Sequence, residues 1–191
     1  MESTSSTTPP PAFQIRKATF SDVPALQSLI DLSVRTLHTT SYTPEVITLA
    51  LKSVYGVDTT LLSDGHYFAV TPSSSPEAII ACGGWSHRST LYGGDQFSSR
   101  DPTVLDPKAD AAKIRAMFVH PGWTRKGVGR FLIEACEKAA SEAGFKKVEM
   151  GATLAGVKFY ESMGYAVIEK QERDLGEGFV LELMKMGKTF S

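Results

Sequence analysis

The sequence lacks the features that mark disulfide-stapled, membrane-spanning and nucleic-acid-binding proteins. It has only two cysteines in 191 residues, Cys82 and Cys136, and each lies in an apolar stretch. This argues against a disulfide framework and favours a reducing compartment, the cytoplasm. No apolar run reaches the roughly 18 residues of a membrane span, so we expect no membrane insertion. A formal net charge of -1 gives no overall attraction to nucleic acid or to an anionic membrane.

The composition that remains is that of a globular protein with one core. The chain is 42% hydrophobic and 21% charged, and its 191 residues suit one domain rather than two. Residues 1–12, "MESTSSTTPPPA", have neither the apolar segment of a secretory signal nor the arginines of a transit peptide. We therefore predict a disordered tail over residues 1–12 and a single domain over residues 13–191.

Hydrophobic periodicity and turn residues predict a mixed α/β sheet with helices on both faces. Ser21 and Thr43 are the expected caps of two early helices, and two later helices are expected over residues 128–143 and within "LAGVKFYESMGY". The second and third strands should pair as a hairpin, as should the last two. The strands are expected at residues 13–18, 66–71, 78–85, 113–119, 146–150, 165–173 and 179–186.

The segment "HPGWTRKGVGRFL" joins the strand at residues 113–119 to the helix that follows it. Gly127 and Gly129 lack the Cβ atoms that would keep an anion away from the backbone, and Arg125, Lys126 and Arg130 lie beside them. The N–H groups and the positive end of the helix dipole favour an anion at this place. The segment therefore predicts a phosphate site, and its plainer interpretation is a tight turn without a ligand.

Two common phosphate-binding motifs do not fit this turn. A P-loop has four residues between its glycines and a following Lys-Ser or Lys-Thr, whereas here one residue separates them and Arg130 follows. A dinucleotide fingerprint would need a glycine where Leu132 stands, although Glu149 lies at about the distance of its ribose-binding acid. A third interpretation is a site for the pyrophosphate of coenzyme A. It requires neither the glycine spacing of a P-loop nor a glycine at position 132.

In the same segment the sequence resembles the GNAT superfamily of acetyl-CoA-dependent N-acetyltransferases. That family has the signature Gln/Arg-x-x-Gly-x-Gly/Ala after a strand that ends near Val-x-Pro. In "MFVHPGWTRKGVGR" the matching residues are Val119, Pro121, Gly127 and Gly129, while Thr124 stands at the Gln/Arg position. Thr124 at this position weakens the case for a side-chain contact with the cofactor there, but it does not affect the expected backbone contacts.

The second half of the family signature follows in the expected order. The family often has Asn-x-x-Ala-x-x-x-Tyr-x-x-x-Gly-Phe, and this chain has "TLAGVKFYESMGY". Tyr160, Gly164 and Tyr165 match, whereas Thr153 and Gly156 replace the family's Asn and Ala. The resemblance extends from about residue 13 to the C-terminus and is strongest over residues 113–165.

The resemblance implies a GNAT fold, in which the two central strands of the mixed sheet splay apart and acetyl-CoA enters the gap as co-substrate. It implies no metal. The backbone of Met117, Phe118 and Val119 would lie along the pantetheine arm, and the plainer interpretation of these residues is a core strand. The pyrophosphate would be held by Arg125, Lys126, Gly127, Val128, Gly129 and Arg130.

Tyr160 is the catalytic candidate that the resemblance implies. A tyrosine hydroxyl, with an ordinary pKa of about 10, stays protonated at neutral pH and can donate a proton to a departing thiolate. The alternative is an aromatic side chain that only packs on the sheet. The general base stays open between His87, Asp95, Glu149 and ordered water.

The sequence thus predicts an N-acetyltransferase that moves an acetyl group directly from acetyl-CoA to a primary amine. Neither cysteine has a neighbouring histidine, so a thiol nucleophile has no support. A small-molecule amine is favoured because no acidic stripe for a basic peptide is visible. A protein or peptide acceptor, and an acyl-CoA-binding domain without catalysis, remain alternatives. The long loop at residues 86–112 is expected to shape the acceptor site, and a homodimer is left open.

Overall fold

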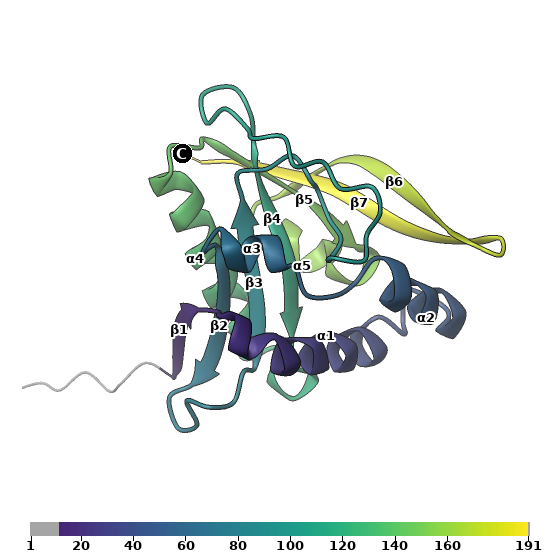
Figure 1. Cartoon of the computed structure of the whole chain (residues 1–191), viewed down its shortest axis with the longest axis horizontal. Coiled ribbons are helices and arrows are strands. Elements are labelled where there is room, and N and C mark those ends of the chain that lie inside the picture. Colours follow the sequence, from purple (N-terminus) through teal and green to yellow (C-terminus); the bar gives the residue numbers. More distant parts are fainter. Residues whose placement is uncertain (1–11, 191) are drawn as a thin grey trace, which may run out of the picture.

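The computed structural model describes residues 12–190 and arranges seven strands of that range in one sheet (Figure 1). The tail predicted over residues 1–12 lies outside the described residues except for Ala12. Within residues 12–190 the structure contains no helix of the length and apolarity that crossing a bilayer requires. The strands are β1 (Phe13–Lys17), β2 (Tyr67–Pro72), β3 (Ala81–Ser86), β4 (Ala112–Val119), β5 (Lys147–Thr153), β6 (Ala166–Gly176) and β7 (Phe179–Thr189).

The strand order across the sheet is β1-β2-β3-β4-β5-β7-β6. Every neighbouring pair is antiparallel except β4 and β5, which are parallel and are joined through a crossover helix. The predicted hairpins β2–β3 and β6–β7 are both confirmed. The prediction of a mixed sheet is therefore confirmed.

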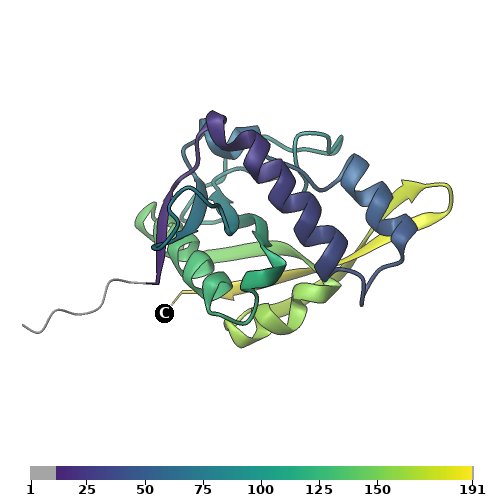
Figure 2. The same cartoon turned by 90° about the horizontal axis from the view of Figure 1, so that it is seen from below.

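Helices cover both faces of this sheet, as predicted. Figure 2 shows α1 and α2 on one side of the sheet and α4 and α5 on the other. α1 packs on β4, α4 packs on β3 and β4, and α5 packs on β5, which leaves a buried apolar core on each face. The helices are α1 (Val23–Leu37), α2 (Pro44–Ser53), α3 (Thr59–Ser63), α4 (Val128–Glu142) and α5 (Val157–Ser162).

Two local predictions were wrong, and one short helix was missed. Ser21 does not cap α1, because a 3-10 turn (Phe20–Asp22) precedes that helix and the Asp22 carboxylate accepts the Thr19 N–H at 2.8 Å. The third strand begins at Ala81, not at residue 78. The sequence analysis also missed α3, which Asp58 caps by accepting the Thr60 N–H at 3.1 Å. A five-residue helix is too short to show a helical repeat of apolar residues.

The two central strands are paired only where they begin. The register partners of β4 and β5 are Ala112 with Val148 and Lys113 with Glu149, after which the strands diverge. Ala116 has a φ of 54°, and the register between β3 and β4 shifts beside it. Such a β-bulge increases the local twist and bends a strand. The splayed central strands of the prediction are confirmed, and the gap opens toward their carboxyl ends.

Candidate active site

A cleft of about 770 Å³ occupies the gap beyond the paired ends of β4 and β5. Its walls come from the C-terminal part of α1, the end of β4, the glycine turn and the segment from Thr153 to α5. The predicted site residues that line the cleft are Met117, Phe118, Val119, Arg125, Gly127, Gly129, Arg130 and Tyr160.

The glycine turn presents its backbone to this cleft. Gly127 has a φ of 84° and is the N-cap of α4, and no side chain caps the helix at this position. A Cβ atom on Gly127 would meet nothing within 4 Å, so the position faces open space. The first N–H groups of an α-helix have no acceptor within the helix. The turn therefore offers backbone donors at the positive end of a helix dipole, as an anion site requires.

The charge of the cleft wall is positive. Arg125, Arg130 and Lys158 line it, and no carboxylate does so among the described residues. Two predicted cofactor-binding residues lie apart from the wall. Lys126 places its Nζ 5.0 Å from the centre of the Trp123 ring, and the side chain of Val128 is buried. A basic wall with backbone donors is suited to a polyphosphate.

Tyr160 lies where this cleft meets a second, smaller cavity. It lines both, and its ring contacts Phe159 and Tyr165 edge-on at 5.1 and 5.9 Å between centroids. Burial raises the pKa of the Tyr160 hydroxyl above its ordinary value, so the group stays protonated at neutral pH. The hydroxyl is therefore available as a proton donor at the junction.

The second cavity encloses about 80 Å³ on the inner side of Tyr160. Residues 91–94 of the long loop form one wall, and Tyr92 packs so closely on β5 that a Cβ atom on Gly151 would lie 2.7 Å from its ring. Tyr55, Phe118 and Met150 supply further apolar surface. No carboxylate of the described chain lines this cavity either. Arg115 and His38 also line it, so its size and mixed lining suit a small group with both apolar and polar parts.

A buried ion-pair network holds the loop wall in place. Arg115 of β4 donates to Asp58 at 2.6 Å, to the Thr90 carbonyl at 2.9 Å and to the Gly93 carbonyl. Asp58 also accepts a hydrogen bond from Arg100 at 2.7 Å. Desolvation lowers the pKa of the Arg115 guanidinium to about 10, so it stays charged at neutral pH. The network ties the loop to β4 and to the start of α3.

His38 is a cleft residue that the sequence analysis missed. It follows α1, is 7% exposed and lines both cavities, and its ring contacts Tyr55 at 5.5 Å. Burial lowers the pKa of His38 to about 4, so the imidazole is neutral at physiological pH and accepts a proton poorly. No local motif surrounds it, so no sequence signal pointed to it.

We expect His38 to make the protein less stable in mild acid. Its pKa is about 4 in the folded protein and about 6.5 when unfolded, so between these values the unfolded state binds more protons. The free energy of unfolding should therefore fall as the pH drops through this window, by roughly 3 kcal/mol in all. Urea titrations at about pH 7 and about pH 4.5 should show a smaller loss for His38→Gln than for the wild type. The matched variant His120→Gln should behave as the wild type, and equal losses in all three proteins would contradict this assignment.

The three side-chain candidates for the general base line neither cavity. Glu149 pairs with Lys113 at 2.6 Å and with Lys185 at 3.6 Å. Asp95 accepts the Thr59 N–H at 3.0 Å outside the second cavity. His87 follows β3, at the end of the sheet away from the cleft. The structure brings Tyr160 and the glycine turn together at one cleft and places His87, Asp95 and Glu149 away from it.

Known acetyltransferases resemble this chain in sequence over the part that carries the glycine turn and Tyr160. The Acetyltransferase (GNAT) domain family matches residues 106–188, from the end of the long loop to β7. An uncharacterized N-acetyltransferase of Chlorobaculum tepidum is 38% identical over 60 residues, which are 31% of this chain and 37% of that protein. The aligned part thus spans little more than a third of that relative.

Solved structures share the whole fold at low sequence identity. A GCN5-related N-acetyltransferase from Rhodopseudomonas palustris superposes with a TM-score of 0.67 at 18% identity, over 93% of this chain and 95% of that one. The acetyltransferase yncA of Salmonella typhimurium, solved with acetyl-CoA, gives 0.60 at 16% identity over 95% of each chain. Residues 106–188 thus match the GNAT acetyltransferase domain family, and the described chain shares the fold of the GCN5-related N-acetyltransferase from Rhodopseudomonas palustris.

Proposed function

We propose that this protein is an acetyl-CoA-dependent N-acetyltransferase whose domain spans residues 13–191 and whose acceptor is a primary amine of a small molecule. The observation that carries the proposal is the position of Tyr160. It stands between a basic cleft that ends at a helix N-terminus and a smaller cavity. One opening suits a long, phosphate-bearing donor and the other suits the acceptor. The structure of yncA with acetyl-CoA supports the donor assignment.

The residues of the cleft bind and orient the donor in this proposal. The N–H groups at Gly127, Val128 and Gly129 hold the pyrophosphate, and Arg125 and Arg130 neutralise its charge. Among residues 12–190, no strand pairs with the edge of β4 that faces β5 beyond Lys113. The backbone of Met117, Phe118 and Val119 is therefore free to align the pantetheine arm as a neighbouring strand would. Lys126 contributes to the positive potential near the cleft.

The acetyl group passes directly from the thioester of acetyl-CoA to the amine nitrogen. As the carbon–sulfur bond breaks, the Tyr160 hydroxyl donates its proton to the departing sulfur. The amine nitrogen gives its proton to water, because no carboxylate of the described chain lines either cavity and His38 has a low pKa. A proton from water then restores the Tyr160 hydroxyl, so the products are the amide and free coenzyme A. Cys82 and Cys136 are buried, and burial raises the pKa of both thiols, so neither serves as a nucleophile. Free, buried thiols also support the cytoplasm as its location.

A single assay tests the proposal against its alternatives. Release of free thiol from acetyl-CoA should require a small primary amine and should saturate with it. Release that occurs only with peptides would make the protein a peptide acetyltransferase. Binding of acetyl-CoA without release, across a panel of both kinds of amine, would leave a domain that binds acyl-CoA without catalysis.

Replacing Gly129 with leucine should weaken acetyl-CoA binding by at least about tenfold, a loss of about 1.4 kcal/mol. The added Cβ would lie 3.2 Å from the Phe159 ring, and the rest of the side chain would occupy the cleft in front of the first turn of α4. A titration of acetyl-CoA followed by thermal shift measures the loss. The matched variant is Gly122→Leu, which changes the same segment between β4 and α4 at a residue that does not line the cleft. It should bind acetyl-CoA as tightly as the wild type does. Stabilisation by NAD in place of acetyl-CoA would overturn the assignment of the site.

Replacing Tyr92 with alanine should change the Michaelis constant for the amine several-fold and leave that for acetyl-CoA nearly unchanged. Tyr92 forms part of the small cavity, contacts Phe97 at 5.1 Å between ring centroids and does not line the larger cleft. Steady-state kinetics with either substrate varied separates the two constants. Val104 on the same loop is 63% exposed and lines neither cavity, so Val104→Ala is the control. An unchanged amine constant in Tyr92→Ala would remove this loop from acceptor recognition.

A further inference from the structure

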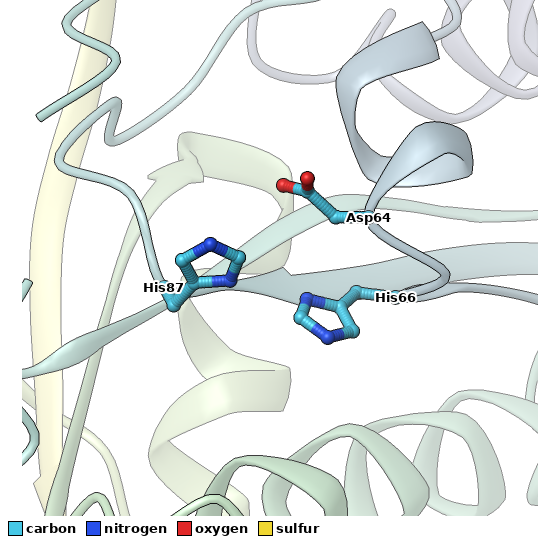
Figure 3. Close-up of side chains that lie close together, drawn as sticks. All are labelled: Asp64, His66 and His87. Atoms are coloured by element: carbon cyan, nitrogen blue, oxygen red, sulfur yellow. The ribbon is translucent and has the colours of Figure 1, made fainter. Parts of the chain in front are cut away.

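Three side chains with metal-binding groups gather at the end of the sheet away from the cleft. Asp64 follows α3, His66 directly precedes β2 and His87 directly follows β3. One potential ligand atom from each lies within 4.8 Å of the others. Figure 3 shows the carboxylate and the two imidazole rings around a common space. The cluster lies beside the paired start of β4, whereas the cleft lies at the other end of that strand.

The His66 ring packs between two aromatic rings, and one of its nitrogen atoms lacks a hydrogen-bond partner among the described residues. It stacks on Trp85 at 4.0 Å between centroids and 20° between planes, and His87 meets it edge-on at 5.3 Å. The Nδ1 atom of His66 is buried, and among the described residues it has no hydrogen-bond partner. A buried polar atom without a partner costs free energy, which coordination of a cation would recover.

Asp64 is oriented by an arginine and keeps room for a further bond. Arg88 donates to its two oxygens at 2.8 and 2.9 Å. A carboxylate offers about four lone-pair positions, so two stay free for a cation. Outer partners of this kind commonly fix the geometry of a coordinating group. The positive charge of Arg88 opposes a second cation, so the affinity should be below that of a closed four-ligand site.

We propose that Asp64, His66 and His87 bind a divalent zinc ion, with water in the fourth position. Two imidazoles and one carboxylate are nitrogen and oxygen ligands that zinc accepts in tetrahedral geometry. With bonds of about 2 Å the ligand atoms would lie about 3.3 Å apart. Since they now lie within 4.8 Å of one another, the side chains need to close by at most about 1.5 Å. His87 lies beyond the end of β3, where a change of rotamer can supply this movement.

The ion would act as a clamp on the long loop. The His87 carbonyl accepts the Leu105 N–H at 2.8 Å, and Arg88 forms an isolated bridge with Val104. His87 thus stands where the two ends of the loop meet, while Asp64 and His66 belong to the turn before β2. Zinc would tie these two segments together. The proposal is independent of acetyl transfer, because none of the three residues lines the cleft or the small cavity.

Metal titration of the chelator-treated full chain tests this site directly. Isothermal titration with Zn²⁺ should show one site, and Co²⁺ should give the intense visible absorption of a tetrahedral complex. His87→Ala and Asp64→Asn should each weaken Zn²⁺ binding at least about tenfold, since each removes one ligand. The matched variant His120→Ala should bind as the wild type, and Zn²⁺ should raise the Tm of the wild type but not of His87→Ala.

Several outcomes would overturn the assignment. Wild-type affinity for Zn²⁺ no tighter than that of His87→Ala would remove His87 as a ligand. Normal binding by Asp64→Asn would do the same for the carboxylate. Co²⁺ that keeps the pale spectrum of the hydrated ion would show that no such site forms. A loss of binding in His120→Ala would place the metal elsewhere.

Discussion

Replacing Tyr160 with phenylalanine should lower kcat by roughly 10²–10⁴-fold while acetyl-CoA still binds. Tyr160 lines both cavities, and its hydroxyl has a raised pKa and so carries a proton at neutral pH. Without that proton the sulfur of coenzyme A must leave as a bare thiolate. The change keeps the ring and its edge-on contact with Phe159, so packing should survive.

Tyr165→Phe is the matched control for this experiment. Its ring lies 5.9 Å from that of Tyr160 and is 3% exposed, but it lines neither cavity. Steady-state kinetics should show the loss in Tyr160→Phe alone, with a normal thermal shift on addition of acetyl-CoA in both variants. An unchanged kcat in Tyr160→Phe would reduce Tyr160 to a packing residue. Equal losses in the two variants would point to packing as well.

Replacing Asp58 with alanine should lower the free energy of unfolding by about 3–5 kcal/mol. Asp58 is fully buried and pairs with Arg115 at 2.6 Å and with Arg100 at 2.7 Å. Alanine would leave the buried Arg115 guanidinium without its counter-charge and would remove the N-cap of α3. Urea unfolding at neutral pH measures the loss as a lower midpoint.

The pair of Asp31 and Arg35 on α1 supplies the control. These side chains are 45% and 51% exposed and meet at 2.9 Å, so Asp31→Ala should cost less than about 1 kcal/mol. A loss in Asp58→Ala as small as that in Asp31→Ala would mean that the buried network contributes no more than a surface pair. Because Arg115 also holds the Thr90 and Gly93 carbonyls, Asp58→Ala should raise the Michaelis constant for the amine as well.

Local chemistry let the sequence predict the glycine turn at the start of α4. Gly127 has a positive φ, which glycine adopts readily, and this requirement acts within a few residues of the chain, whereas a Cβ on Gly129 would meet the distant Phe159 ring. The hairpins were predicted correctly for the same reason, because the alternation of apolar residues and the turns between them are local signals. The splayed strands and the place of Tyr160 were expected from the resemblance, not from periodicity.

The groups that surround the smaller cavity depend on contacts between distant parts of the chain. Asp58 and Arg115 are separated by 57 positions, and Tyr92 packs on Gly151 of β5. Such pairs follow from the order of the strands and from the path of the long loop, and neither can be derived from a local pattern. The sequence analysis accordingly singled out the long loop but not the residues that hold residues 91–94 against the smaller cavity.

The sequence by itself determined the glycine turn that begins α4, because backbone conformation and helix ends are set by adjacent residues. Only the tertiary structure decided which titratable groups stand near the chemistry. It buries His38 at the junction of the cavities, pairs Glu149 with lysines of β4 and β7, and carries His87 to the opposite end of the sheet. The protonation and the reach of a side chain depend on its neighbours in space, and the sheet assembles those neighbours from strands far apart in the sequence.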